Sequence, residues 1–263
     1  MSISSIGIMQ GRILPRHIDQ LQIFPSNTWH EEFSIAENIG FQHIELLWDS
    51  KKDIKNAKRL IHSATEFTQL HVPSMCVDSI CSCTSLRGIL NEILDVINTF
   101  KENTPSVLVI PLLDRATVNT VCKLKEFINE ANVHKIWNLL QKYDIKLALE
   151  LDMPVAGVVE AIKCIDSNLI GICLDSGNLW HYSDSPINDI RALSDKIIHV
   201  HIKDRDKEGE NVLLGKGLVD FNLFFKVLED ILYSNAMTLQ TKYFKNPPNE
   251  ARKNLQYILK MMQ

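Results

Sequence analysis

Four polar side chains stand at or near the ends of four successive β-rich runs in the second half of the chain. Glu150 and Asp175 end two of these runs, and His201 and Gln240 lie in the last two. Carboxylate oxygens, an imidazole nitrogen and an amide oxygen are all ligands of divalent cations. Because the set contains no thiolate, it suits Mn²⁺, Mg²⁺, Co²⁺ or Zn²⁺, with the harder ions favoured. The four side chains therefore predict a site for one divalent metal ion.

Such a site requires strands whose ends converge on one edge. Short β-rich runs alternate with longer amphipathic stretches along the whole chain, as in repeated βα units around a parallel sheet. Eight such units close a barrel, whose active sites lie at the C-terminal ends of the strands. We therefore predict an α/β fold, a single (β/α)8 TIM barrel forming one domain over residues 1–263. The eight runs are Ser5–Met9, His43–Leu47, Gln69–Val72, Ser106–Pro111, Lys146–Glu150, Ile170–Asp175, Ile197–Lys203 and Met237–Thr241.

Composition narrows the classes of partner. The chain has 263 residues, of which 45% are hydrophobic, and a formal net charge of -4, so no basic field would attract nucleic acid. No run reaches the roughly 18 apolar residues needed to span a bilayer, and no signal peptide is recognised. Six scattered cysteines fit reduced thiols. We expect a cytoplasmic protein that binds neither nucleic acid nor membrane.

Each of these features has a simpler explanation when taken alone. A carboxylate at a strand end often caps the following helix, and a lone histidine is commonly a hydrogen-bonded core residue. A doubly wound open sheet is the rival topology. The turn after the first run, Met9–Arg12, lacks the G-x-G-x-x-G fingerprint that usually accompanies its nucleotide-binding version. The joint occurrence on four successive strands is what favours the barrel with a metal site.

Several motifs extend the pattern over nearly the whole chain: Ile6–Arg12, Leu149–Asp152, Leu174–Asn178, His199–Asp204, and Gly215–Gly217 followed by Asp220 and Phe221. With these motifs the chain resembles the xylose isomerase-like TIM barrel superfamily of sugar phosphate isomerases and epimerases. That superfamily includes ketose 3-epimerases, inosose dehydratase and hydroxypyruvate isomerase. By position, the resemblance places metal ligands on Glu150, Asp175 and His201, with the fourth on Gln240.

Gln240 departs from the family pattern, which has a glutamate there. In the epimerases that this chain resembles, the first and last glutamates are the two acid/base groups. An amide does not titrate near neutral pH, so Gln240 could coordinate or orient but could not act as a base. The resemblance thus implies a divalent-metal-dependent isomerase or epimerase of a sugar or sugar phosphate, acting through an enediolate. We expect Glu150 to be the base and Lys203 or His71 to be the second proton donor.

Further residues are expected to bind the substrate. Arg12 and Lys216 are candidates for binding anionic groups, because each lies in a loop predicted at the catalytic rim. Glu45, Trp48 and Asn178 are further candidate rim contacts, although a salt bridge would also explain Glu45 and packing would explain Trp48. The expected partner is a small-molecule sugar or sugar phosphate, and a homodimer is compatible with the sequence.

Two other functions are kept as alternatives. A non-catalytic sugar-binding barrel is motivated by Gln240. The AP endonucleases share the barrel, so a metal-dependent phosphodiesterase is the second alternative. Asn178 stands where that group has a ligand histidine, and Pro111 occupies the matching end of the fourth strand. Together with the acidic charge balance, these two positions disfavour nucleic-acid cleavage.

Overall fold

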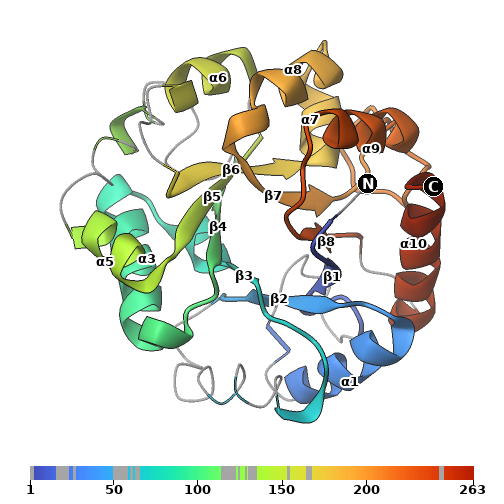
Figure 1. The fold of residues 1–263 in the computed structure, drawn as a ribbon, viewed down its shortest axis with the longest axis horizontal. Helices are drawn as coiled ribbons and strands as arrows, with labels where there is room; N and C mark the ends of the chain where they lie inside the picture. Colours follow the sequence, from blue (N-terminus) through green and yellow to red (C-terminus); the bar gives the residue numbers. More distant parts are fainter. Residues whose placement is uncertain are drawn as a thin grey trace.

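Eight parallel strands close into a barrel in the order β1 to β8, with β8 pairing back onto β1 (Figure 1). The structure is a computed structural model. It describes residues 3–15, 24–25, 28–49, 59, 62, 66–113, 123, 125–127, 129, 135–152, 155–163, 168–242 and 246–263. The strands are β1 Ile6–Met9, β2 His43–Leu47, β3 Ser74–Cys76, β4 Val107–Leu112, β5 Lys146–Leu151, β6 Ile170–Asp175, β7 Ile197–Ile202 and β8 Met237–Leu239.

Helices surround the barrel on the outside, as Figure 1 shows along the barrel axis. Within the described residues, no helix is long and apolar enough to cross a membrane. The α-helices are α1 Trp29–Ile39, α3 Leu86–Phe100, α5 Lys135–Tyr143, α6 Val155–Lys163, α7 Ser176–Tyr182, α8 Pro186–Ala192, α9 Phe221–Asp230 and α10 Pro247–Met261. Short 3₁₀ turns are η2 Asp78–Ser82, η3 Lys101–Asn103 and η4 Ser194–Lys196.

The strands separate two hydrophobic cores because successive side chains on a strand point to opposite faces. The larger core fills the space between strands and helices and takes residues such as Ile44, Leu149 and Val200. A smaller core fills the barrel interior with Met9, Leu47, Cys76, Val109, Ala148 and Cys173. Glu45, Glu150 and Asp175 each lie two positions from one of these interior residues, and His199 is paired with Cys173. These polar side chains therefore also point into the barrel.

Local signals account for several helix ends. The side chain of Asp220 caps α9 by accepting a hydrogen bond of 3.0 Å from the Leu223 backbone N–H. Gly40 ends α1 with φ 108°, a conformation that glycine adopts without a Cβ penalty.

The third strand lies further along the chain than predicted. The sequence indicated Gln69–Val72, but β3 is Ser74–Cys76, and His71 forms only an isolated bridge to His43. Pro73 has no N–H to donate to a ladder, which separates the early run from the strand itself. Since His43 opens β2, His71 lies at the N-terminal end of the barrel and is exposed. The prediction that placed His71 at the catalytic rim is therefore wrong.

Candidate functional site

Five buried polar side chains gather at the C-terminal ends of β5 to β8, and we call them the rim site: Glu150, Asp175, His201, Lys203 and Gln240. One ligand atom each from Glu150, Asp175 and His201 lies within 4.8 Å of the others. Lys203 follows β7 and Gln240 follows β8, so both extend the series of inward-facing positions beyond the strand ends. The sequence predicted all five residues for the site, and the structure brings all five together.

Glu150 is fully buried, and both of its carboxylate oxygens lack a hydrogen-bond partner among the described residues. Its Oε1 lies 3.5 Å from Nδ1 of His201 and 3.9 Å from Nζ of Lys203. Burial alone would raise the pKa of Glu150, but His201 and then Lys203 lower it to about 2. Glu150 is therefore an ionised, unmatched carboxylate at neutral pH, the state that a general base needs.

Asp175 uses its two oxygens for different purposes. Oδ1 caps α7 by accepting a hydrogen bond of 2.8 Å from the Asn178 backbone N–H. Oδ2 is buried and lies 2.7 Å from Nζ of Lys203. The helix cap fixes the carboxylate orientation, so that Oδ2 is presented to the centre of the rim site.

The chemistry of these donors fits a divalent cation. Both oxygens of Glu150 and Nδ1 of His201 are buried, with no hydrogen bond within the part of the chain that is described. Buried polar atoms without partners are costly, and an ion is one explanation for them. Two carboxylates and one imidazole form a mixed oxygen and nitrogen set of the kind that binds Mn²⁺, Co²⁺ or Zn²⁺. Lys203 lies next to the same atoms.

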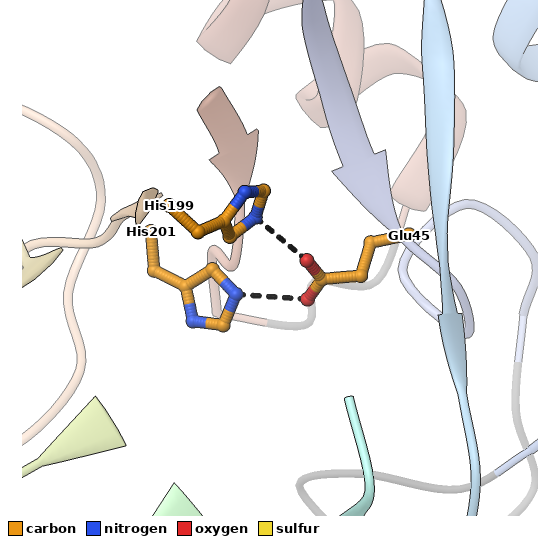
Figure 2. A group of neighbouring side chains, drawn as sticks. All are labelled: Glu45, His199 and His201. Atoms are coloured by element: carbon orange, nitrogen blue, oxygen red, sulfur yellow. Dashed lines mark hydrogen bonds and ion pairs between the residues drawn. The ribbon is translucent and has the colours of Figure 1, made fainter. Parts of the chain in front are cut away.

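A second polar group lies deeper in the barrel, and we call it the inner network: Ser5, His43, Glu45, Ser74, His199 and Thr238. Figure 2 shows its centre, where Nε2 of His199 donates to Oε2 of Glu45 at 2.7 Å and Nε2 of His201 donates to Oε1 at 2.8 Å. Ser74 donates a third bond to Glu45 at 2.7 Å. These contacts fix the His201 ring so that its Nδ1 faces Glu150 in the rim site.

Nearby charges and hydrogen bonds shift the pKa values of Glu45 and His201. Burial would raise the pKa of Glu45, but His201 and His199 lower it well below its usual value. Burial would likewise lower the pKa of His201, but Cys173 and the Glu45 and Glu150 carboxylates raise it well above its usual value. Glu45, which we predicted to contact the substrate, lies behind His201 and holds that ring in position for the rim site.

The inner network continues towards the N-terminal end of the barrel. Oγ of Thr238 lies 3.4 Å from Oε2 of Glu45, to which it donates, and 2.9 Å from Nε2 of His43. Nδ1 of His43 forms a 2.8 Å hydrogen bond with Ser5. Burial lowers the pKa of His43 to about 3, helped by His199. His43 is therefore a neutral imidazole at pH 7, with both ring nitrogens hydrogen-bonded.

Gly7 is required beside this histidine. A Cβ at position 7 would lie 2.0 Å from Cδ2 of the His43 ring, a distance that no pair of non-bonded carbon atoms tolerates. The glycine on β1 therefore gives the imidazole of β2 its place inside the barrel.

The other predicted substrate contacts lie near the rim in different settings. Arg12 follows the turn after β1 and is buried, and that turn is held by Glu32, which accepts from the Gly11 N–H at 2.8 Å. Trp48 follows β2 and packs edge-on against Phe100, with ring centroids 5.5 Å apart. Asn178 is buried in the first turn of α7.

Lys216 lies exposed in the loop between β7 and α9. The loop is organised by Asp204, whose carboxylate accepts from the N–H groups of Gly215, Gly217 and Val219 at 2.9 to 3.1 Å. A Cβ at position 217 would lie 2.2 Å from Oδ1 of Asp204. Gly217 thus allows the loop backbone to approach Asp204 closely.

A cavity of about 260 Å³ lies at the opposite, N-terminal end of the barrel, and its lining includes Ser106, Lys146 and His199. It contains none of the predicted metal ligands. The chemistry of the rim site is therefore separated from this cavity by the inner network.

Sequence reasoning missed Asp78. It lies two residues beyond Cys76, at the rim end of β3, and its Oδ1 is 3.9 Å from Sγ of Cys81. Burial raises the pKa of Asp78 to about 6, with further contributions from Glu150 and Asp49 and an opposing one from Arg12. The misplaced third strand hid this carboxyl, since a strand over Gln69–Val72 would have left residue 78 far into a loop.

The chain is similar in sequence and in fold to known proteins. The chain is 23% identical over 280 aligned positions to L-ribulose-5-phosphate 3-epimerase UlaE of Salmonella paratyphi A, covering 95% of each chain. Among solved structures, 3-keto-D-glucoside 4-epimerase YcjR from E. coli has a TM-score of 0.74 at 16% identity, covering 97% of this chain and 99% of that one. An IolI protein with a bound zinc atom has a TM-score of 0.72 at 15% identity, covering 98% and 96%.

A family model gives the assignment. The model of the xylose isomerase-like TIM barrel matches residues 124–261, just over half of the chain. The matched part contains β5 to β8, and with them all five residues of the rim site. The chain therefore belongs to the xylose isomerase-like TIM barrel family.

Proposed function

We propose that this protein is an isomerase or epimerase of a sugar or sugar phosphate, moving a proton at a carbon next to a carbonyl group. The observation that carries the proposal is Glu150, a buried and ionised carboxylate with both oxygens unmatched at the rim. Proton abstraction next to a carbonyl needs such a base within reach of the substrate. Relatives and structural neighbours named as sugar epimerases support the same reaction class.

A divalent ion is part of the proposal, held by Glu150, Asp175 and His201. Such an ion would act as a Lewis acid that polarises the substrate carbonyl and stabilises enediolate charge. Glu150 would remove the proton, and His201 would be held in position by Glu45. The zinc named for one structural neighbour supports this part of the proposal.

The second proton must come from a group other than Gln240, whose amide is neither a Brønsted acid nor a Brønsted base near neutral pH. Lys203 is the candidate within the rim site, with its Nζ 3.9 Å from Oε1 of Glu150. Asp78, which lies just beyond the end of β3, is a second candidate for the proton donor.

We assign the binding of anionic substrate groups to Arg12 and Lys216, and we assign substrate contact to Trp48 and Asn178. We assign the protein to the cytoplasm.

Proton exchange tests the proposal directly. Ketoses and their phosphates would be incubated in D₂O with the protein, with Mn²⁺ or with chelator, and the loss of the C–H signal next to the carbonyl would be followed by NMR. The proposal expects exchange with at least one pentulose, hexulose or phosphate ester, lost in Glu150→Gln. Exchange that Glu150→Gln leaves intact would overturn it.

The second candidate is a barrel that binds sugars without catalysis, which Gln240 favours. It predicts that sugars raise the unfolding temperature of the protein without any deuterium incorporation. The same samples therefore separate the two functions, because binding and exchange are measured on one set of ligands.

A further inference from the structure

The side chain of Lys203 ends in the middle of the predicted metal ligands. Its Nζ lies 2.7 Å from Oδ2 of Asp175, 3.1 Å from Oε1 of Gln240 and 3.9 Å from Oε1 of Glu150. The side chain is buried, with 6% of its surface exposed. An ammonium group among these oxygens meets the same electrostatic requirement that a metal ion would meet.

The backbone of Lys203 is fixed by Ser176, and its ammonium is carried on a flexible stem. Oγ of Ser176 donates to the Lys203 carbonyl at 2.6 Å and accepts from the Lys203 N–H at 2.9 Å. Gly177 leaves room beside the stem, since a Cβ there would lie 3.3 Å from Cγ of Lys203. The flexible four-carbon stem can therefore carry the charge away from Asp175 without moving β7.

Gln240 has the chemistry of a partner for this lysine. Its Oε1 accepts the 3.1 Å hydrogen bond from Nζ, so the amide oxygen faces the lysine. A carboxylate at this position would add a third negative charge beside Glu150 and Asp175. The amide binds the ammonium without adding a further negative charge beside these two carboxylates.

We propose that Lys203 is the resident cation of the rim site when no divalent ion is bound, and that Gln240 is a positioning residue for Lys203 rather than a fourth ligand. Binding of a divalent ion by Glu150, Asp175 and His201 requires the ammonium to leave Asp175, while Gln240 retains it at the rim. Lys203 thereby weakens divalent-ion binding. This inference rests on the metal site of the proposed function.

The test is the affinity for Mn²⁺, measured by isothermal titration calorimetry on protein freed of metal by chelation. Lys203→Met should bind Mn²⁺ at least about tenfold more tightly than the wild type, because no ammonium competes for Asp175. Lys203→Arg keeps the charge and should bind Mn²⁺ with affinity close to wild type. Lys226→Met, which removes an exposed lysine from α9, is the control for loss of charge and should change nothing.

Gln240→Met separates the two roles of that residue. If Gln240 only holds Lys203, this variant keeps wild-type Mn²⁺ affinity to within a few-fold. A loss of about tenfold or more would show that the amide is a ligand and would overturn its assignment as a positioning residue. Equal or weaker Mn²⁺ binding in Lys203→Met would overturn the resident-cation proposal.

A stability measurement covers the case in which Lys203→Met folds poorly. In chelator, Lys203→Met and the milder Lys203→Gln should both unfold at lower temperature than wild type, and Mn²⁺ should raise their unfolding temperatures by more than it raises that of the wild type. An equal Mn²⁺ shift in all three proteins would contradict the proposal. If neither wild type nor Lys203→Gln binds Mn²⁺, this inference fails, while proton exchange in chelator would leave the proposed isomerase or epimerase standing.

Discussion

The inner network and the rim site are both buried, polar and joined through His201, yet their hydrogen bonding is opposite. Glu45 in the inner network faces donors from Ser74, His199, His201 and Thr238. Glu150 in the rim site accepts no hydrogen bond among the described residues and has only the longer contacts with His201 and Lys203, at 3.5 and 3.9 Å. A buried acceptor left without a donor costs about 1–3 kcal/mol. Buried polar groups that have hydrogen-bond partners stabilise the fold. A buried carboxylate without such a partner at a strand end indicates a place where a ligand binds it.

The largest expected effect comes from removing the unmatched carboxylate. Glu150→Gln keeps the shape of the side chain but removes the base, so proton exchange on the sugar should fall by about a thousandfold or more. The free energy of unfolding should fall by less than it falls in Glu45→Gln, because Glu150 has only its 3.5 Å and 3.9 Å ion-pair contacts with His201 and Lys203 to lose. NMR exchange and urea unfolding measure the two quantities. Exchange within tenfold of wild type would contradict the assignment of Glu150 as the base.

The corresponding substitution in the inner network, Glu45→Gln, should mainly lower the stability of the protein. Glu45→Gln puts an amide NH₂ among groups that already donate, and it leaves one of the His199 and His201 rings without its acceptor oxygen. We expect the free energy of unfolding to fall by about 3 kcal/mol, the usual cost of breaking a buried charged pair. Urea unfolding measures it, with the exposed Glu208→Gln as control. If Glu45→Gln were as stable as Glu150→Gln, the contrast between the two regions would be wrong.

Acid should weaken the inner network through His43. Its pKa in the folded protein, about 3, lies below the unfolded value, so its stabilising contribution is present above about pH 6.5 and is lost as the pH falls towards 3. Charged and titratable groups around it are His199, Glu45 and His71. Between pH 7 and pH 5 the wild type should lose about 2 kcal/mol more unfolding free energy than His43→Gln. Parallel pH dependence of the two proteins would show that His43 does not titrate in this way.

The smallest expected effect concerns Asp78 at the edge of the rim. Its pKa in the folded protein, about 6, lies above the unfolded value, so its contribution is present below about pH 3.8 and is lost as the pH rises through 6. At pH 8, Asp78→Asn should therefore be more stable than wild type by about 1 kcal/mol, a value discounted for partial exposure. Thermal unfolding at pH 4 and pH 8 measures the difference. A gain of the same size at pH 4 would exclude ionisation as its cause.

The amino-acid sequence determined the barrel and the membership of the rim site. Alternation of β-rich runs with helical patterns identifies parallel strands, and parallel strands bring Glu150, Asp175, His201 and Gln240 to one edge. The period of two along a strand also orients these side chains inward. These are local properties, which is why sequence reasoning reached them. It misplaced β3 because the run before Pro73 has the same composition as a strand, and it lost Asp78 with that error.

Only the tertiary structure decided which atoms meet inside the barrel. Contacts between Glu45 on β2 and His201 on β7, or between Lys203 after β7 and Gln240 after β8, depend on how far each strand is staggered against the next. Stagger is a property of the closed sheet and cannot be deduced from the order of residues in the sequence. The sequence therefore supplied Glu45, Lys203 and Gln240 as candidates, and closure of the barrel placed Glu45 behind His201 and paired Lys203 with Gln240.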